Sequence, residues 1–212
     1  MVQTLRATKM ERTRQAIVAA GMELFAERGF DAVTVADIAG RADIGPRTFH
    51  RYYPDKAELL FVGDDELHQA LHSALRQQPP GDSIPVYLLA VLEAAVQPLT
   101  GRHAELVVRE GLLHQAPALR ARDLAKRFSL EQTVAEHIAD RLGVSLDHDV
   151  RPRWWAGVAF ATFTAAYQTW LIDGGALSTH LQAAGRLLSE EGADTPAQRE
   201  HPPAQAPTSA PA

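Results

Sequence analysis

Residues 34–56 read TVADIAGRADIGPRTFHRYYPDK. The stretch from Thr34 to Asp37 has the spacing of a capping box, in which the residues at the two ends of a first helical turn bond each other's backbone N–H groups. A turn at 43–45 separates this short helix from a second one that runs through Arg51. Two short helices joined by a three-residue turn form a helix-turn-helix, so this stretch predicts the fold of the N-terminal part.

The second of these helices has two different sides. At about 100° per residue, Phe49 and Tyr53 share the side that can pack against the preceding helices. Arg47, His50 and Arg51 lie on the opposite side. Such a helix fits the major groove of DNA, where arginine reads guanine edges and hydroxyl groups hold phosphates. The alternative is a solvated basic face above a buried aromatic pair.

Helical periodicity continues on both sides of this stretch. An apolar stripe predicts a first helix that ends at Arg28-Gly29, and a second capping signature, Asp55 to Glu58, predicts a helix to about Gln77. After a break at 78–83, no pattern of alternating β-branched residues appears. Further helices are expected at about 84–99, 102–114, 117–142, 149–173 and 177–190. The fold class is therefore all-α with about nine helices.

Composition limits the class of protein. The 212 residues are 46% hydrophobic and 22% charged, as in ordinary soluble globular proteins. No cysteine is present, which excludes disulfides and thiolate metal sites, and the N-terminus lacks a signal-peptide core. A cytoplasmic location is expected. Residues 1–56 hold 9 Lys/Arg against 7 Asp/Glu, whereas the remainder is acidic, which is compatible with a polyanion bound by the N-terminal part.

The residues quoted above also carry a family resemblance. Thr34-Val-Ala-Asp-Ile38-Ala39, Ala42, Ile44, Thr48-Phe49-His-Arg-Tyr52-Tyr53, Lys56 and Leu59 resemble the N-terminal signature of TetR-family transcriptional regulators. The resemblance implies an all-α homodimer with a helix-turn-helix DNA-binding domain at 1–56 and a ligand-binding and dimerisation domain at 57–192. The Pro/Ala-rich segment at 193–212 is expected to be a disordered tail.

The resemblance also implies which residues meet DNA. Thr34 would cap its helix and touch a phosphate, Arg47 would contact a base, and Tyr52 would contact a phosphate. Lys56 would reach a further phosphate from the start of the fourth helix. The full expected set is Thr34, Gly45, Pro46, Arg47, Thr48, His50, Arg51, Tyr52 and Lys56. Departures from the family pattern, at Gly40, Asp43, Gly45 and His50, affect the expected base preference.

Residues 154–172, WWAGVAFATFTAAYQTWLI, carry no charge over 19 positions. The length admits a membrane span, but the many alanine, threonine and glycine residues favour a helix buried on every side, with one face against a dimer partner. In the TetR family the last two helices form the dimer. The expected interface residues are Phe160, Thr164, Tyr167, Leu171, Leu181 and Leu188.

A small-molecule pocket is expected among the middle helices. Its apolar walls would come from Tyr87, Val91, Leu92, Leu106, Leu113 and Phe128, and its polar groups from Arg109, Glu110 and His114. The alternative is that the apolar residues are simply core and the polar residues simply surface. The segment RTFHRYYPDK, residues 47–56, also resembles the corresponding segment of a TetR branch associated with mycofactocin clusters and acyl-CoA-like effectors.

The sequence shows no phosphate-binding glycine loop and no nucleophile–base pair, so an enzyme is not expected. His68 and His72 have a chelating spacing without an evident third ligand, so neither a metal nor a cofactor is expected. The sequence predicts a transcriptional regulator, specifically a repressor, that binds a near-palindromic DNA operator as a homodimer. A small, largely apolar effector, for example an acyl-CoA-like molecule, would release it. A helical enzyme, a metal-binding protein and a membrane-associated protein are the rival interpretations.

Overall fold

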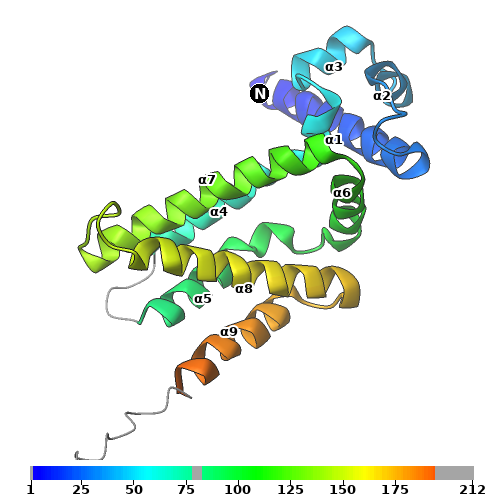
Figure 1. Ribbon diagram of the computed structural model, residues 1–212. Helices are drawn as coiled ribbons and strands as arrows, with labels where there is room; N and C mark the ends of the chain where they lie inside the picture. The colour runs from blue at the N-terminus through cyan, green and yellow to red at the C-terminus, as the bar shows by residue number, and fades with distance from the viewer. Residues whose placement is uncertain (1, 78–82, 194–212) are drawn as a thin grey trace, which may run out of the picture.

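The computed structural model describes residues 2–77 and 83–193, and side chains from 7 to 187 within those ranges. Every regular element in these ranges is a helix, which confirms the all-α prediction (Figure 1). The expected tail lies outside the described residues, apart from Ala193. The elements are α1 Val2–Arg28, α2 Val35–Arg41, α3 Pro46–Tyr52, η1 Lys56–Phe61, α4 Asp64–Gln77, α5 Ile84–Ala95, η2 Gln97–Leu99, α6 His103–Gln115, α7 Pro117–Leu142, α8 Arg151–Asp173 and α9 Leu177–Ala193.

The predicted capping box starts α2. The Thr34 hydroxyl accepts from the Asp37 N–H at 3.1 Å, and the Asp37 carboxylate accepts from the Thr34 N–H at 2.8 Å. These bonds satisfy N–H groups that a helix start leaves unpaired. Asp43 adopts the left-handed conformation, with φ 54°, in the turn before α3. The helix-turn-helix prediction is confirmed.

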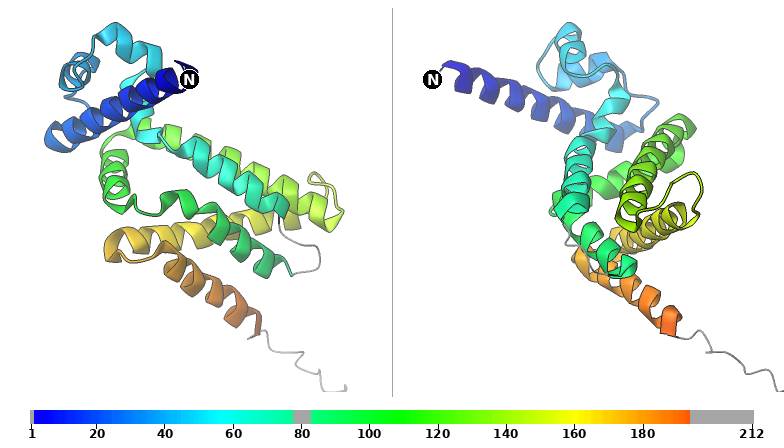
Figure 2. Two further views of the ribbon diagram at one scale, coloured as in Figure 1. Left: turned by 180° about the vertical axis from the view of Figure 1, so that it is seen from behind. Right: turned by 90° about the vertical axis from the view of Figure 1, so that its left-hand side faces the viewer.

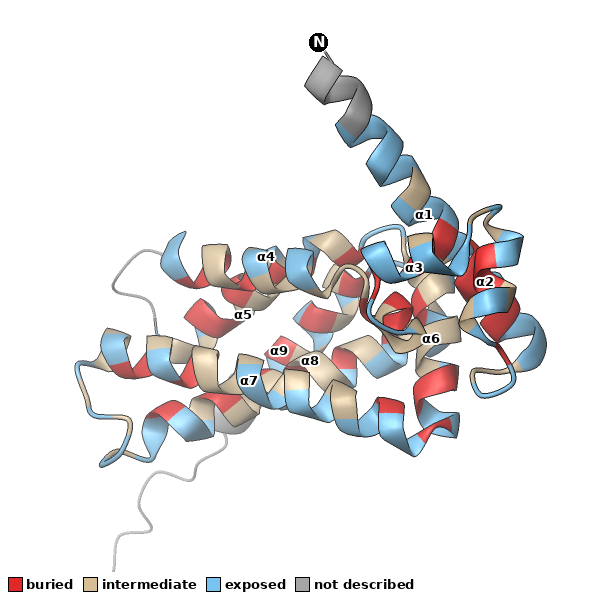
Figure 3. Cartoon of the chain, turned by 90° about the horizontal axis from the view of Figure 1, so that it is seen from above, coloured by how far each residue is buried: buried red, intermediate tan, exposed pale blue. Residues whose placement is uncertain are grey.

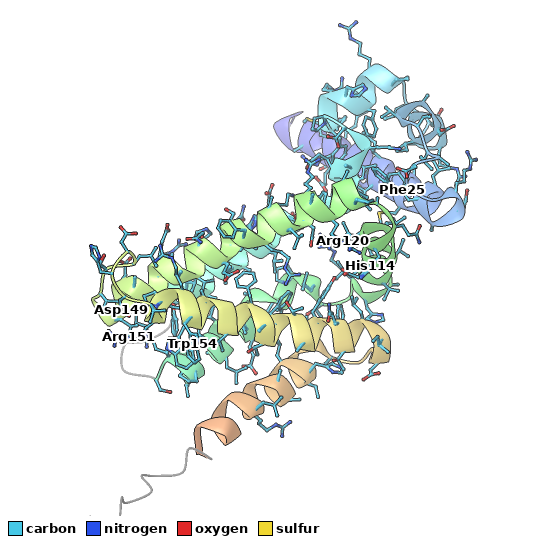
Figure 4. All side chains as sticks on the ribbon, in the orientation of Figure 1. Phe25, His114, Arg120, Asp149, Arg151 and Trp154 are labelled. Atoms are coloured by element: carbon cyan, nitrogen blue, oxygen red, sulfur yellow. The ribbon has the colours of Figure 1, made fainter. Side chains whose placement is uncertain are left out.

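The core of this N-terminal part extends into the following helices. Phe25, Ile38 and Phe49 are at most 1% exposed in one apolar cluster with the side chains of η1. The same cluster contains Leu112, Leu113, Ala116 and Leu119, which come from the α6–α7 corner. Figure 4 shows Phe25 close to this corner, where His114 and Arg120 are labelled. The helix-turn-helix therefore packs directly on the body.

The helix predicted from 55 to 77 is wrong in one respect, because it is two elements. Asp55 caps the 3-10 helix η1 by accepting from the Glu58 N–H at 3.0 Å, and the chain bends at Val62 and Gly63 before α4 begins. Gly63 has φ 92°, and a Cβ there would meet the Arg102 guanidinium at 2.1 Å. The positive φ favours glycine, and a larger side chain would also displace the Arg102 guanidinium from its bond to the Val62 carbonyl. This bend is called the hinge segment below, defined as Leu60–Asp64.

The body is a bundle in which α4 and α7 lie side by side and α8 crosses below them, with α5 behind and α9 at the bottom (Figures 1 and 2). One buried cluster joins α4, α5, α7 and α8 around Tyr87 and Ile138, and a second joins α8 and α9 around Trp170 and Leu181. Seen from above, buried residues line the inner sides of α4, α5 and α7 (Figure 3).

The helix expected to be buried on every side, α8, has one open side in the single chain. Trp154 is 57% exposed and Ile172 is 84% exposed, and Ala161, Ala165 and Thr169 between them are exposed too. These positions recur at helical spacing, so they form one stripe, which we call the α8 stripe.

Within the described residues, no single helix is long and apolar enough to cross a membrane. Only the pair of helical segments Ile84–Leu99 and His103–Gln115, bent by 96° between them, reaches the required length and hydropathy together.

Candidate DNA interface and ligand cavity

The α3 helix presents a cationic outer surface. Phe49, which is fully buried, and Tyr53, which is 4% exposed, anchor it, and their rings lie 6.0 Å apart. Arg47, His50 and Arg51 are exposed, as the helical spacing predicts. Pro46 occupies the first turn after Gly45, where a missing N–H costs nothing. Figure 1 shows α3 at the top of the molecule, away from the body.

The flanking residues of the expected DNA contact set lie around this surface. Thr34 is exposed at the start of α2, and Thr48 and Tyr52 are half-buried on α3. The Arg51 guanidinium lies 5.2 Å from the centre of the Tyr52 ring. In the described part of the chain, Arg47 has neither a hydrogen bond nor an ion pair, so its donors are available to a ligand.

Lys56 is oriented differently from this set. Its ammonium donates to the carbonyl oxygens of Val33 at 2.6 Å, Phe30 at 2.7 Å and Asp31 at 3.4 Å, and lies 4.4 Å from the centre of the Phe30 ring. An ammonium has three donors, and all three are engaged. In this structure Lys56 fastens η1 to the loop between α1 and α2.

The structure adds contacts in this part that spacing along the chain could not reveal. Arg41 donates to Glu23 and Glu27 at 3.2 and 3.0 Å, which joins α2 to α1 and turns this cation away from the α3 surface. Arg14 lies 5.6 Å from the centre of the Tyr53 ring and joins α1 to the end of α3. The first contact holds α2 against α1, and the second holds the end of α3 against α1.

Two adjoining cavities occupy the body. The outer cavity, of about 110 Å³, lies between the hinge segment and helices α4, α6, α7 and α8, and has both charged and apolar walls. The second cavity, of about 50 Å³, is called the inner cavity here because no residue of the hinge segment lines it; its walls are only apolar side chains, mainly of α4, α5, α7 and α8. Leu67, Leu130, Phe160 and Phe163 line both. A volume of this size has room for several water molecules.

Three paired cations of the outer cavity contact the hinge segment. Arg102 donates to the Val62 carbonyl at 2.8 Å and to Glu105 at 2.7 Å. Arg109 donates to the Leu60 carbonyl at 2.8 Å and to Asp123 at 2.5 Å. Lys126 pairs with Asp64 at 2.9 Å and lies 4.4 Å from the centre of the Phe61 ring. The wall of the cavity is therefore also the support of the hinge.

Two pKa values describe the electrostatics of this cavity. Burial disfavours the charge of Arg109, but the adjacent Asp123 carboxylate holds the pKa of the guanidinium above its ordinary value. Burial, with smaller effects of the neighbouring charges, raises the pKa of Tyr167 to about 12, so its hydroxyl stays protonated. That hydroxyl makes no hydrogen bond to any described residue.

The residues expected to bind a ligand divide into two groups. Val91 and Leu92 line the inner cavity, while Leu106, Arg109 and Glu110 line the outer one. The others lie outside both cavities. Tyr87 is core, with its hydroxyl donating to the Leu75 carbonyl at 3.2 Å; Leu113 packs under the helix-turn-helix; and His114 and Phe128 are exposed.

The residues expected at a dimer interface lie mainly inside the subunit. Phe160, Thr164 and Tyr167 line the outer cavity, Leu181 is fully buried, and Leu171 is partly buried against the same cluster. The side chain of Leu188 lies outside the described residues. The α8 stripe was missed because an uncharged helix shows no polar face in its sequence.

Within the described residues, no three His, Cys, Asp or Glu side chains gather as metal ligands; the His72 ring instead lies 6.0 Å from that of His137.

Known proteins resemble this chain over most of its length. Residues 17–62 match the family model of the bacterial regulatory proteins of the tetR family, and residues 86–192 match the model of the MftR C-terminal domain. The transcriptional regulator TcmR of Streptomyces glaucescens is 32% identical, over 79% of this chain and 77% of TcmR. The transcriptional repressor LfrR of Mycolicibacterium smegmatis is 27% identical, over 74% of this chain and 79% of LfrR. The structure of the TetR-family repressor FadR of Thermus thermophilus with lauroyl-CoA has a TM-score of 0.50 and 24% identity, over 92% of this chain and all of FadR.

Proposed function

This chain belongs to the TetR family of bacterial transcriptional regulators, and from that premise we propose that it is a homodimeric repressor released from its operator by a small, largely apolar effector. Members of the family are transcriptional regulators, not enzymes. Most are repressors, as the name of LfrR states for that relative. Operator, dimer and effector are the proposed parts, and each has its own support.

The exposed surface of α3 supports the DNA contact. In the proposal α3 enters the major groove, where Arg47 reads a base edge and Arg51 and His50 lie over the backbone. Thr34, Gly45, Pro46, Thr48 and Tyr52 surround this contact and meet sugar and phosphate groups. Lys56 acts by holding η1 in place. The observation that carries the proposal is the exposed guanidinium of Arg47, unpaired among the described residues, on a helix whose opposite side buries Phe49.

The α8 stripe supports the homodimer. Large apolar side chains such as Trp154 and Ile172 are seldom left in water when they share a face with alanine residues. On α9, Leu187 is 59% exposed and extends the apolar surface. A two-fold pairing of α8 and α9 would bury both, and it would set the two α3 helices about one turn of DNA apart.

The cavities support effector control. A molecule in the outer cavity would contact Arg102, Arg109 or Lys126, each of which holds the hinge segment. It would shift the DNA-binding part only to the extent that it binds one hinge geometry more tightly than the other. The lauroyl-CoA in the structure of Thermus thermophilus FadR is one example of a ligand with a long apolar part.

DNA upstream of the chain's own gene tests the function. Fluorescence anisotropy with labelled fragments should show binding that exceeds binding to a scrambled fragment by at least about 1000-fold, as specific regulators do. Affinity should fall steeply with salt, since phosphate contacts release counterions. If no fragment from the gene neighbourhood binds better than the scrambled control, the operator proposal is wrong.

A further inference from the structure

Resting on the proposed effector site, we propose that the ligand is an amphipathic acid with a single anionic group, held at Arg127 in the outer cavity, with its apolar part in the inner cavity. The charges and contacts of the cavity walls carry this inference. They define a head site at Arg127 on α7, which bonds Thr164 on α8, and a tail site that begins at Phe160, one helical turn before Thr164.

The head site is the only cation of the cavity without a carboxylate partner in the described part of the chain. Arg102, Arg109 and Lys126 are neutralised by Glu105, Asp123 and Asp64, and are bound to the hinge segment besides. Arg127, in contrast, donates to the uncharged Thr164 hydroxyl at 2.6 Å. A guanidinium has five N–H donors, so most of those of Arg127 remain open to a ligand.

The Thr164 hydroxyl fixes the direction of this guanidinium. It donates to the Phe160 carbonyl at 2.7 Å while it accepts from Arg127, so its donor is used and it cannot itself bind an anion as donor. An anionic oxygen that binds Arg127 would therefore displace at most the uncharged Thr164 hydroxyl. The binding of an anion there therefore breaks no ion pair.

The tail site begins next to the head site. Phe160 lies one helical turn before Thr164 on α8 and lines both cavities, as does Leu67 on α4. Beyond them the inner cavity has no polar side chain in its wall. An apolar chain or ring that extends from a group at Arg127 would enter a region that offers burial and no hydrogen bond, which excludes a second polar group there.

The carboxylates of the outer cavity limit the ligand to one charge. Asp64, Glu110 and Asp123 all line it, and Glu105 balances Arg102, so among the described residues Arg127 is the one lining arginine or lysine without a carboxylate partner. Glu110 has only a histidine partner, His114, at 3.6 Å. A polyanion such as a coenzyme A thioester would face these carboxylates without enough free cations to balance them. The free acid is favoured over its thioester.

Isothermal titration with decanoate, decan-1-ol and decanoyl-CoA tests this proposal on the full chain. Decanoate should bind, and decan-1-ol should bind about 10- to 100-fold more weakly because it lacks the hydrogen-bonded charge. Decanoyl-CoA should bind more weakly than decanoate because its several negative charges face the cavity carboxylates. Arg127→Gln should weaken decanoate by the same factor and leave decan-1-ol within about twofold. The matched control is Arg120→Gln, which removes the same charge from the exposed start of α7 near His114 and should change neither ligand (Figure 4).

Thr164→Val provides a second variant of nearly unchanged shape, should Arg127→Gln fail to fold. It removes the oxygen that orients the guanidinium and should weaken decanoate, but not decan-1-ol, by about three- to tenfold. The proposal is overturned if wild type does not bind decanoate, if decan-1-ol binds equally well, if decanoyl-CoA binds more tightly, or if neither variant weakens the acid. The same samples are assayed for operator binding. Specific DNA binding without acid binding would refute the ligand class alone, whereas loss of both would refute the proposed function.

Discussion

The Nε of Arg109 donates to the backbone carbonyl of Leu60 over 2.8 Å. Arg109 lines the outer cavity, and Leu60 is 3% exposed in the core of the helix-turn-helix. One side chain thus joins the wall of the candidate ligand site to the DNA-binding part. Asp123 completes the arrangement, because its carboxylate accepts from the same guanidinium over 2.5 Å.

Removal of Asp123 should destabilise the protein. Asp123→Ala leaves the largely buried Arg109 charge without its counter-ion, and we expect the free energy of unfolding to fall by about 2–4 kcal/mol. Urea denaturation followed by circular dichroism measures this. Asp147→Ala, which breaks the exposed pair with Arg153 at 3.7 Å, is the control and should change stability by less than about 0.5 kcal/mol. Equal losses of unfolding free energy for the two changes would show that the buried pair stabilises the protein no more than the exposed pair does.

Arg47→Ala should weaken operator binding without unfolding the protein. The side chain is exposed and makes no hydrogen bond or ion pair within the described residues, so its loss should remove mainly a DNA contact of about 1–3 kcal/mol. Anisotropy titrations should show a 5- to 150-fold higher Kd for the operator and a smaller change for scrambled DNA. Arg28→Ala, in the same domain but off α3, controls for loss of charge; an equal loss of affinity there would argue against groove docking.

Lys56→Met should lower the stability of the fold and leave the DNA contacts unchanged. The change removes three hydrogen bonds to the α1–α2 loop, so the melting temperature should drop by several degrees. The slope of log Kd against log salt for operator DNA should stay that of wild type. A slope lower by about 0.9 at unchanged melting temperature would instead indicate that the ammonium leaves the loop and meets a phosphate.

Ile172→Glu should disrupt the homodimer. A carboxylate within an apolar two-fold contact is desolvated in both subunits, and we expect the dimer dissociation constant to rise by at least about 100-fold. Sedimentation velocity across a concentration series measures it. Val86→Glu, at a position 55% exposed on α5 and outside the α8 stripe, should leave the dimer intact. If wild type itself sediments as a monomer at micromolar concentration, the dimer proposal is refuted.

Asp149→Ala should lower stability in a pH-dependent manner. The Asp149 carboxylate accepts from the Arg151 side chain at 2.6 Å and from the Arg151 N–H at 2.9 Å, next to the start of α8 (Figure 4). These bonds lower the pKa of Asp149 from 3.8 to about 2. The stabilisation is therefore fully present above about pH 4 and is lost as the pH falls toward 2. Melting curves of wild type and variant should differ at pH 6 and converge near pH 2, with Asp147→Ala as the exposed control.

Local patterns were enough to predict the all-α fold, the capping box at Thr34 and the division of α3 into the buried Phe49 and the exposed Arg47. These features depend on residues within one or two helical turns, where spacing fixes direction. The break of the predicted helix at Gly63 was missed, because the Arg102 guanidinium that bonds the Val62 carbonyl beside it lies about 40 residues further along the chain.

Only the tertiary structure decided which uncharged faces of α8 are buried, and it placed Phe160, Thr164 and Tyr167 at a cavity and Ile172 in the open stripe. A helix without polar residues carries no hydrophobic pattern that could separate core, cavity and partner surface. The same holds for cations, since Arg109, Lys56 and Arg47 are alike in sequence as single positive charges. Their roles differ because of the carbonyl or carboxylate groups that distant elements bring beside them, and burial makes those partners obligatory for the first two.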